Sequence, residues 1–315
     1  MAINLITEYQ KKIAERFSLG SLTDEAAGHD YDFAGTKTIE VLSVDTVATV
    51  DYTRSGTARY GDVTELGDTK QTLTLAVDKG FTFSIDAGNA AEQYNIKQAN
   101  RCLKREWDEV CTPEIDAYRL KSWATGKGLS SGKAVLSNTD ASLTKANIVD
   151  AIFNGSAAMS DKKVPRKNRY LFIPELTFVK FKLADVVMGG GQMNKEAVEK
   201  GFKGTIDGMK VVTVPSSIWP TLSGGGTINF MIKYKGATVD PMKLKNLRVQ
   251  KNPMGIDGDV VEGRYIYDSF VKDSACDGIY ISTGSTSGGS SSLSYRAGYS
   301  PPCKINRRCW SWRLC

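Results

Sequence analysis

Two overlapping glycine-rich segments carry the residue patterns closest to known catalytic motifs. Residues 128–132 (GLSSG) match the Gly-x-Ser-x-Gly pattern that presents a serine nucleophile in hydrolases. That mechanism needs a histidine later in the chain, whereas His29, the only histidine, lies far upstream. Residues 126–134 (GKGLSSGKA) resemble a phosphate-binding loop, but Lys127 stands where the first glycine belongs and Ala134 replaces the metal-binding hydroxyl. Neither segment predicts a catalytic site.

The other candidate ligands are sparse. Residues 189–191 (GGG) follow a predicted helix, so they are better explained as a helix stop than as a phosphate cradle. Asp257 and Asp259 lack the remaining oxygen ligands of a calcium loop. The six cysteines include no Cys-x-x-Cys pair, which argues against structural zinc and a disulfide framework. We therefore predict no catalytic, cofactor-binding or metal-binding residue, and we expect a protein that is not an enzyme.

The net charge of +6 is unevenly distributed along the chain. Residues 281–315 contain five basic residues and no acidic one. The rest of the chain holds 36 of the 41 basic residues and all 35 acidic ones. A domain that binds duplex DNA needs a concentrated basic face, which this balance does not predict for the body. No window approaches 18 consecutive apolar residues, so we expect a soluble protein with no membrane partner.

The first 35 residues indicate an arm with one short amphipathic helix. Residues 5–17 (LITEYQKKIAERF) place Leu5, Tyr9, Ile13 and Phe17 at helical spacing. The polar stretch that follows has no clear period. We therefore expect no packed element between this helix and about residue 35.

A change to period two predicts a long β-hairpin over 36–86. Residues 72–86 alternate apolar and polar side chains, which predicts a single strand on the order of 40 Å long. Residues 38–53 are also rich in β-formers, and the polar, glycine-containing residues 54–70 predict a mobile tip between the two strands. A two-stranded hairpin is marginal alone, so it needs a partner surface from its own domain or another subunit.

The strongest helical signal covers 89–123. Ile96, Leu103 and Trp107 lie on one apolar stripe, and Pro113 is expected to kink or break the helix. Beyond it, helices and strands alternate. Residues 282–292 consist only of Ser, Gly and Thr, which predicts a linker. The pattern as a whole predicts an α+β fold. Helices are expected at 142–154 and 174–188, and strands at 169–173, 209–214, 228–234, 246–250, 264–272 and 278–282.

This order of elements resembles the major capsid protein of tailed bacteriophages, whose shell fold is named after phage Hong Kong 97. The hairpin 36–86 followed directly by the helix 89–123 is similar to the E-loop and spine helix of that family. Residues 204–215 (GTIDGMKVVTVP) are similar to a Gly-turn-strand-Pro stretch in these shells. Residues 256–280, which include IDG, VEGRYIYDSFV and DGIY, are similar to the closing run. The resemblance covers about residues 1–281.

The resemblance implies a Hong Kong 97-like capsid fold with an N-terminal arm, an extended β-hairpin E-loop, a long spine helix, and peripheral and axial domains. The expected divisions are 1–35 for the arm, 36–86 for the E-loop, 87–125 for the spine helix of the peripheral domain, 126–255 for mainly the axial domain, 256–281 for the closing strands of the core, and 282–315 for a Ser/Gly linker and a basic Cys/Trp tail.

The resemblance also implies a function. The chain would self-assemble through hexamers and pentamers into an icosahedral or prolate shell that encloses double-stranded phage DNA. The expected partners are other copies of the chain, a separate scaffolding protein, a portal, and packaged DNA through nonspecific contacts, with no cofactor. The expected location is the virion, after assembly in the cytoplasm of the bacterial host. Lys70 is the candidate for a crosslinking lysine, but no asparagine or glutamate partner is identified by motif, so crosslinking is not predicted.

An extended hairpin cannot bury both faces within its own domain, so we expect the hairpin and the arm to lie on neighbouring subunits. Two alternatives remain open: an encapsulin-like compartment that encloses cargo proteins, and a nucleic-acid-binding protein that uses the basic C-terminal tail. The expected interface residues are Leu5, Tyr9, Ile13 and Phe17 in the arm and Arg54, Arg59, Asp62, Glu65, Asp68 and Lys70 in the hairpin.

Overall fold

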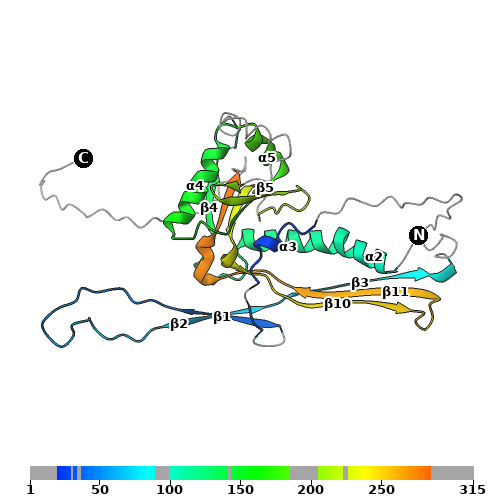
Figure 1. Cartoon of the computed structure of the whole chain (residues 1–315), viewed down its shortest axis with the longest axis horizontal. Coiled ribbons are helices and arrows are strands. Elements are labelled where there is room, and N and C mark those ends of the chain that lie inside the picture. The colour runs from blue at the N-terminus through cyan, green and yellow to red at the C-terminus, as the bar shows by residue number, and fades with distance from the viewer. Residues whose placement is uncertain are drawn as a thin grey trace, which may run out of the picture. The chain divides into compact units, whose positions relative to one another are not determined.

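Most strands of the computed structural model fall into a six-stranded and a three-stranded sheet, and one long helix packs on both (Figure 1). The structure describes residues 20–29, 31–33, 37–88, 99–140, 143–184, 205–222 and 226–284. The predicted arm helix, with Leu5, Tyr9, Ile13 and Phe17, lies outside the described residues. The mixture of helices and strands confirms the predicted α+β class.

The helical elements are η1 (Asp24–Ala26), α2 (Ala99–Glu106), the π-helical turn η2 (Trp107–Cys111), α3 (Thr112–Thr125), α4 (Ile148–Asp161), α5 (Glu175–Lys182), η3 (Lys235–Ala237) and η4 (Asp273–Gly278). The strands are β1 (Thr38–Val44), β2 (Asp68–Thr74), β3 (Val77–Asp86), β4 (Leu136–Asp140), β5 (Arg169–Pro174), β6 (Thr205–Ile206), β7 (Met209–Val214), β8 (Ile228–Tyr234), β9 (Thr238–Val239), β10 (Met242–Lys251), β11 (Gly258–Tyr267), β12 (Phe270–Val271) and β13 (Ile279–Gly284).

The six-stranded sheet has the order β4-β13-β8-β5-β7-β6 and is covered on both faces. The central strand β5 is an almost continuous apolar run, as expected for a strand buried on both sides. Its Leu171 and Ile173 pack with α4 and α5, whereas Tyr170 and Phe172 pack on the face that α3 covers. The strands predicted at 169–173, 209–214 and 228–234 are confirmed, as is a helix near each predicted position after residue 140.

The three-stranded antiparallel sheet has the order β10-β11-β3 and carries α2, η2 and the start of α3 on one face. Cys111 and Ile115 pack against Tyr265 and Tyr267 of β11. Farther along, Leu120 and Trp123 of α3 are fully buried against the six-stranded sheet. One helix therefore contacts both sheets and fixes their spacing.

Pro113 does not break this helix, so the break allowed by the sequence is wrong, and the kink that was the other expected outcome stays a prediction. The backbone stays right-handed helical at Glu106, Cys111 and Thr112. The turn before the proline widens instead, and the Thr112 backbone N–H and hydroxyl both donate to the Trp107 carbonyl. A π turn accommodates a residue that has no N–H and whose ring would clash with a normal helical turn.

The predicted strand 72–86 is two strands that belong to different sheets. β2 pairs antiparallel with β1, from Thr38 opposite Thr74 to Val44 opposite Asp68. β3 pairs with β11 instead. The chain changes partner at residues 75–76, where the Ala76 N–H donates to the buried carboxylate of Asp268 at 2.9 Å. Period-two alternation reports which side chains face a core, but not which strand lies alongside. The hairpin therefore ends at residue 74, not 86.

The domain boundaries expected after residue 125 also do not coincide with the boundaries between the two sheets. β10 (242–251) pairs with β11 in the three-stranded sheet, although the division predicted from sequence places it with 126–255. β13 lies between β4 and β8 in the six-stranded sheet and extends to Gly284, so residues 282–284 are strand and not linker. Ser282 is fully buried, and its hydroxyl donates to Asp140. A serine-rich composition does not reveal that these residues pair with β4.

Candidate subunit interface

The loop between β1 and β2 (residues 45–67, the hairpin loop) is exposed along nearly its whole length (Figure 1). It contains Arg54, Arg59, Asp62 and Glu65, which are expected at an interface from the sequence, and all four are exposed. It also exposes large apolar side chains that were not among the interface residues expected from sequence. Several large apolar residues within a polar segment could have indicated an interface. These are Val47, Val50, Tyr52, Tyr60, Val63 and Leu66.

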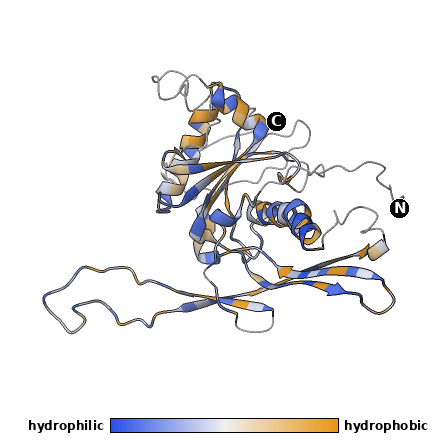
Figure 2. Ribbon diagram, turned by 45° about the vertical axis from the view of Figure 1, so that its right-hand side comes forward, coloured by the Kyte–Doolittle hydropathy of each residue, from blue (hydrophilic) through white to orange (hydrophobic). Residues whose placement is uncertain are grey.

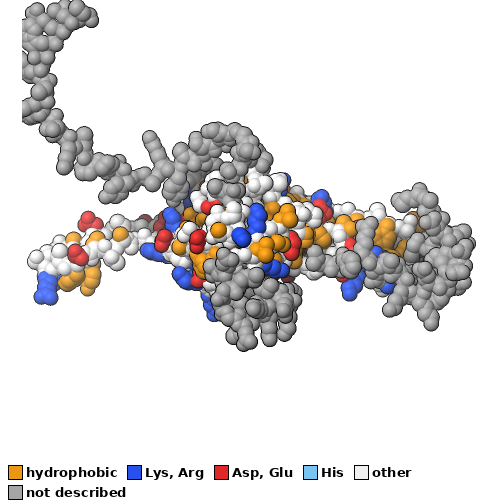
Figure 3. All heavy atoms as spheres, turned by 90° about the horizontal axis from the view of Figure 1, so that it is seen from above, with side chains coloured by type: hydrophobic (Ala, Val, Ile, Leu, Met, Phe, Trp, Pro, Cys, Tyr) orange, Lys and Arg blue, Asp and Glu red, His pale blue; other side chains and the backbone are white. Residues whose placement is uncertain are grey.

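The apolar side chains of the hairpin loop have little cover within the described chain. Tyr60 is 84% exposed and Val63 is fully exposed. Along the hairpin, at the left of each view, Figure 2 shows hydrophobic residues among hydrophilic ones, and Figure 3 shows hydrophobic side chains beside charged ones. A cluster of exposed apolar side chains on one segment is typical of a surface that binds another protein. The hairpin loop is therefore the candidate interface.

The hairpin loop has internal structure of its own. The rings of Tyr52 and Tyr60 meet edge to face, with their centroids 5.0 Å apart. The Thr53 N–H donates to the Arg59 carbonyl at 3.1 Å, and the Arg59 guanidinium donates to the Gly56 carbonyl at 3.1 Å. These contacts fold residues 53–61 into a turn that presents the tyrosines together. Arg59 thus has a structural partner within the loop.

Asp68 and Lys70 lie in strand β2, outside the hairpin loop. Lys70 is opposite Leu42 in the ladder, and its Nζ lies 2.7 Å from Oε1 of Glu40 on the neighbouring strand. Both charged side chains are partly exposed, so this pair contributes little to stability. The structure therefore places Lys70 within its own hairpin, and the prediction of no crosslinking stays a prediction.

The root of the hairpin is fixed by Gln71. Its Nε2 donates to the carbonyls of Gly128 at 2.7 Å and Val271 at 3.2 Å, and its Oε1 accepts from the Asp273 N–H at 3.0 Å. The Ser130 hydroxyl and N–H both donate to the Asp273 carboxylate. The Gly-x-Ser-x-Gly segment is thus a structural anchor for the hairpin, because its central serine is held by an aspartate.

A second anchor lies where β2 passes into β3. The Lys127 Nζ donates to Asp268 Oδ1 at 2.5 Å and to the Tyr118 hydroxyl at 2.6 Å. Tyr118 in turn donates to the same Asp268 oxygen at 2.8 Å. Burial lowers the pKa of Lys127, but its hydrogen bonds to Asp268 and Tyr118 outweigh burial and raise that pKa overall. Lys127 is therefore a charged structural residue.

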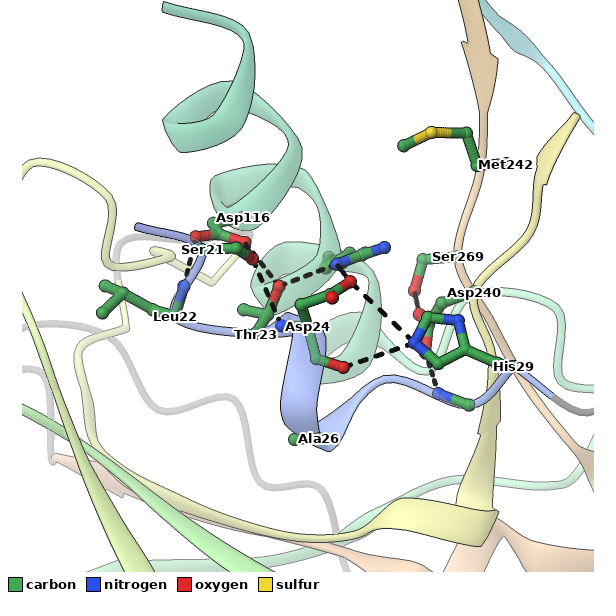
Figure 4. A network of polar contacts seen from close by, with 12 residues as sticks. Ser21, Leu22, Thr23, Asp24, Ala26, His29, Asp116, Asp240, Met242 and Ser269 are labelled. Atoms are coloured by element: carbon green, nitrogen blue, oxygen red, sulfur yellow. Dashed lines mark hydrogen bonds and ion pairs between the residues drawn. The ribbon is translucent and has the colours of Figure 1, made fainter. Parts of the chain in front are cut away.

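Residues 20–29 (the strap) are packed into the body, which corrects the expectation of an unpacked arm there. Asp116 of α3 accepts hydrogen bonds from the Ser21 hydroxyl at 2.9 Å, the Leu22 N–H at 2.7 Å and the Thr23 hydroxyl at 2.5 Å (Figure 4). Arg119, one turn along α3, donates to the Thr23 hydroxyl at 3.2 Å. Short polar side chains have no apolar period, so no local pattern indicates this packing.

The other end of the strap is held by a buried carboxylate. Asp240 accepts from the Gly28 N–H at 2.8 Å and from the Trp123 indole at 2.9 Å. The hydroxyls of Thr238 and Ser269 donate to the same carboxylate at 2.7 and 2.5 Å. Burial raises the pKa of Asp240, but the charge of Lys233 and the two hydroxyls lower it overall, so the carboxylate is charged.

Lys233 is a fully buried amine beside this carboxylate. Its Nζ donates to the Ala26 carbonyl of the strap and lies 4.0 Å from the centroid of the Trp123 ring. Burial lowers the pKa of Lys233 to about 7, against the opposing effect of the Asp240 charge. The strap therefore lies across an ionisable group that titrates near neutral pH.

The lowered pKa predicts a stability that depends on pH. Between about 7 and 10.5 the unfolded state binds a proton at Lys233 that the folded state does not, so the free energy of unfolding rises with pH there. The slope approaches about 1.4 kcal/mol per pH unit. Urea unfolding at pH 7, 8 and 9 measures it. Lys233→Met should remove most of this slope, and an unchanged slope in the variant would contradict the assignment.

Gly28 fits the strap because no Cβ can be accommodated there. A Cβ would lie 1.9 Å from the Thr238 carbonyl oxygen. We expect Gly28→Ala to lower the free energy of unfolding by about 1–3 kcal/mol and to speed amide exchange in residues 20–29. Gly20→Ala is the matched control, because among the described residues no atom beyond its chain neighbours lies within 4 Å of an added Cβ. Equal effects of the two substitutions would refute the close approach.

Side chains that could ligate a metal ion are scattered over the described ranges. No group of three His, Cys, Asp or Glu residues there is arranged to hold a metal ion. Cys102, Cys111 and Cys276 are free thiols. No helix in the same ranges is long and apolar enough to cross a membrane.

Comparison with known proteins identifies the fold. No family model and no curated protein matches the sequence. A solved chain of Mycobacterium phage Che8 matches with a TM-score of 0.66 and 13% identity, over 90% of this chain and 98% of that one. Chains from the capsid of cyanophage P-SCSP1u and the mature capsid of bacteriophage PhiM1 match with TM-scores of 0.64 and 0.65. The cyanophage chain shares 12% identity over 90% of this chain and 93% of its own length. The PhiM1 chain shares 13% identity over 89% of this chain and 91% of its own length.

The chain has the Hong Kong 97-type capsid fold. The assignment of β1, β2 and the hairpin loop to the E-loop, and of α2, η2 and α3 to the spine helix, stays a prediction. The fold is thus similar at only 12–13% sequence identity. The sequence prediction of a capsid fold is confirmed, with the element boundaries corrected as described above.

Proposed function

We propose that this chain is a major capsid protein that assembles into a closed shell. The observation that carries the proposal is the exposed apolar hairpin loop on a chain with the capsid fold. Six large apolar side chains within residues 45–67 lie at the surface of the described chain. Burying them against a second copy would remove apolar area from water, which is the main driving force of protein association. The loop therefore supports assembly as the function.

The geometry of the hairpin favours contacts that propagate. The loop on one copy would meet a different surface on the next copy, which is a heterologous contact. Such contacts close into rings when the rotation between copies allows it, and rings can form a shell. The anchors at Gln71 and Lys127 support this proposal, because a hairpin with a fixed root presents its loop at a defined angle.

The finer parts of the function are proposals on the same basis. We propose that the shell contains hexamers and pentamers, that a separate scaffolding protein and a portal take part in assembly, and that the shell encloses double-stranded DNA in a virion assembled in a bacterial host. We propose a structural and not an enzymatic role. The loop 126–134 supports this last point, since its Ser130 and Lys127 are engaged in structural hydrogen bonds.

Negative-stain electron microscopy and light scattering of the purified chain test the proposal. Rings or closed shells, formed by the chain alone or with a co-expressed scaffolding protein, are the expected result. A persistent monomer under both conditions would overturn it. Co-purified proteins in a small shell would favour an encapsulin-like compartment. A variant without the tail should keep Ser285 as its last residue, because β13 extends to Gly284.

A further inference from the structure

The loop between α4 and β5 gathers positive charge on a body that is balanced in composition. Figure 1 shows the two elements that it joins. Residues 162–167 (KKVPRK) contain four basic residues and no acidic one. Lys162, Lys163, Arg166 and Lys167 are all exposed. Within the described chain only Arg166 has an ion-pair partner, Asp207, at 3.3 Å. Three exposed lysine charges are therefore left without a carboxylate partner among the described residues.

The shape of this loop is fixed from beneath by Arg169. This arginine is 1% exposed, and its guanidinium donates to the carbonyls of Val164 at 2.6 Å, Pro165 at 2.9 Å and Ser156 at 3.0 Å. Lys163 adopts the left-handed conformation, with φ of 61°. A buried guanidinium with this many acceptors holds the loop in one conformation. The exposed cations can therefore bind a ligand without the entropic cost of ordering the backbone.

Capping of α4 explains only part of this charge. A cation at a helix C-terminus interacts favourably with the helix dipole, and Lys162 is the C-cap residue of α4. That effect falls off within the last turn, so it does not account for Arg166 and Lys167. The charge of Arg166 also lowers the pKa of Arg169, after the larger effect of burial. Two cations beyond the helix end thus add positive charge that the helix does not require.

We propose that residues 162–167 (the basic loop) form a binding surface for the phosphate backbone of double-stranded DNA. The proposal rests on the proposed function in naming packaged DNA as the source of that backbone. Protein interfaces have an apolar or aromatic centre, whereas backbone phosphates require only positioned cations. The large exposed apolar side chains of the described chain lie outside the basic loop. A nonspecific DNA contact fits this surface better than an acidic protein does.

Fluorescence anisotropy with a labelled random-sequence DNA duplex, measured at several salt concentrations, tests the proposal on the full chain. The test variant replaces all four cations of the basic loop by glutamine. Two full-chain controls remove similar charge elsewhere. The first replaces the exposed Lys104, Lys121, Lys145 and Lys251 by glutamine. The second replaces Arg307, Arg308 and Arg313 of the tail by glutamine. Urea unfolding checks that each variant is folded.

We expect the basic-loop variant to weaken binding and to reduce the slope of log K against log salt by about 3, since each phosphate contact contributes about 0.9. The control on the body should change the slope by less than about 1. An unchanged slope in the basic-loop variant, or an equal loss in either control, would overturn the proposal. So would displacement of the duplex by polyglutamate at equal charge concentration, because it would indicate an acidic protein partner.

Electron microscopy of the same variants separates this inference from the proposed function. Shells formed by a chain whose DNA binding does not depend on the basic loop would refute the inference alone. DNA binding that depends on the basic loop, in a chain that never forms rings or shells, would support the binding surface and refute the capsid role. Shells together with loop-dependent binding would support both.

Discussion

Replacing Val47, Tyr60 and Val63 with serine is expected to abolish assembly and leave the subunit folded. All three side chains are at least half exposed in the single chain, so their removal should change the free energy of unfolding by less than about 0.5 kcal/mol each. In an interface, each would contribute about 1.5–3 kcal/mol through burial of apolar area. The triple variant should therefore lose about 5 kcal/mol or more per contact, over a thousandfold in the association constant.

Light scattering and electron microscopy measure this loss. A matched variant replaces the charged Arg54, Asp62 and Glu65 of the same loop with serine. Exposed ion pairs contribute little, so this variant should still form shells and should mainly change how assembly depends on salt. Shells of normal size from the apolar triple variant would show that the hairpin loop is not an interface. Loss of shells only in the charged variant would favour the expectation from sequence that charges dominate the contact.

Asp240→Ala is expected to lower the free energy of unfolding more than Gly28→Ala or any substitution in the hairpin loop. The substitution leaves the indole of Trp123, the Gly28 N–H and two hydroxyls without their acceptor. It also leaves the buried amine of Lys233 without its counter-charge. Removal of one member of a buried charged network costs about 3–5 kcal/mol. Urea unfolding should show a loss of this size, with faster amide exchange in residues 20–29.

Asp161→Ala is the control, because Asp161 is exposed at the end of α4. Its effect should stay within about 0.5 kcal/mol. Asp240→Asn keeps a polar group of the same size but removes the charge, so an intermediate loss is expected. If Asp240→Ala lowered the free energy of unfolding by less than about 1 kcal/mol, the strap would not depend on this carboxylate. A lowered pKa of Asp240 also predicts that its contribution is lost only in acid, as pH falls below the unfolded value of 3.8.

The structure changes the interpretation of the polar residues more than that of the apolar ones. Ser130 matches a hydrolase pattern and Lys127 departs from the phosphate-loop pattern, yet both are tied to aspartates that hold the hairpin root. Asp116 and Asp240 carry no recognisable motif, yet they fix the strap. A hydrogen-bonded network depends on residues far apart in sequence, so no local spacing reveals it.

The class of fold, the order of its elements and most strand positions follow from the amino-acid order alone. Apolar periodicity is a local property, and it marks β5, β7, β8 and the long helix directly. Three-dimensional packing was needed to establish which strands pair, where the hairpin ends, and which charges and apolar side chains remain exposed. Leu73 and Phe81 continue one alternating pattern but pack in different clusters, because pairing depends on what the rest of the chain brings alongside.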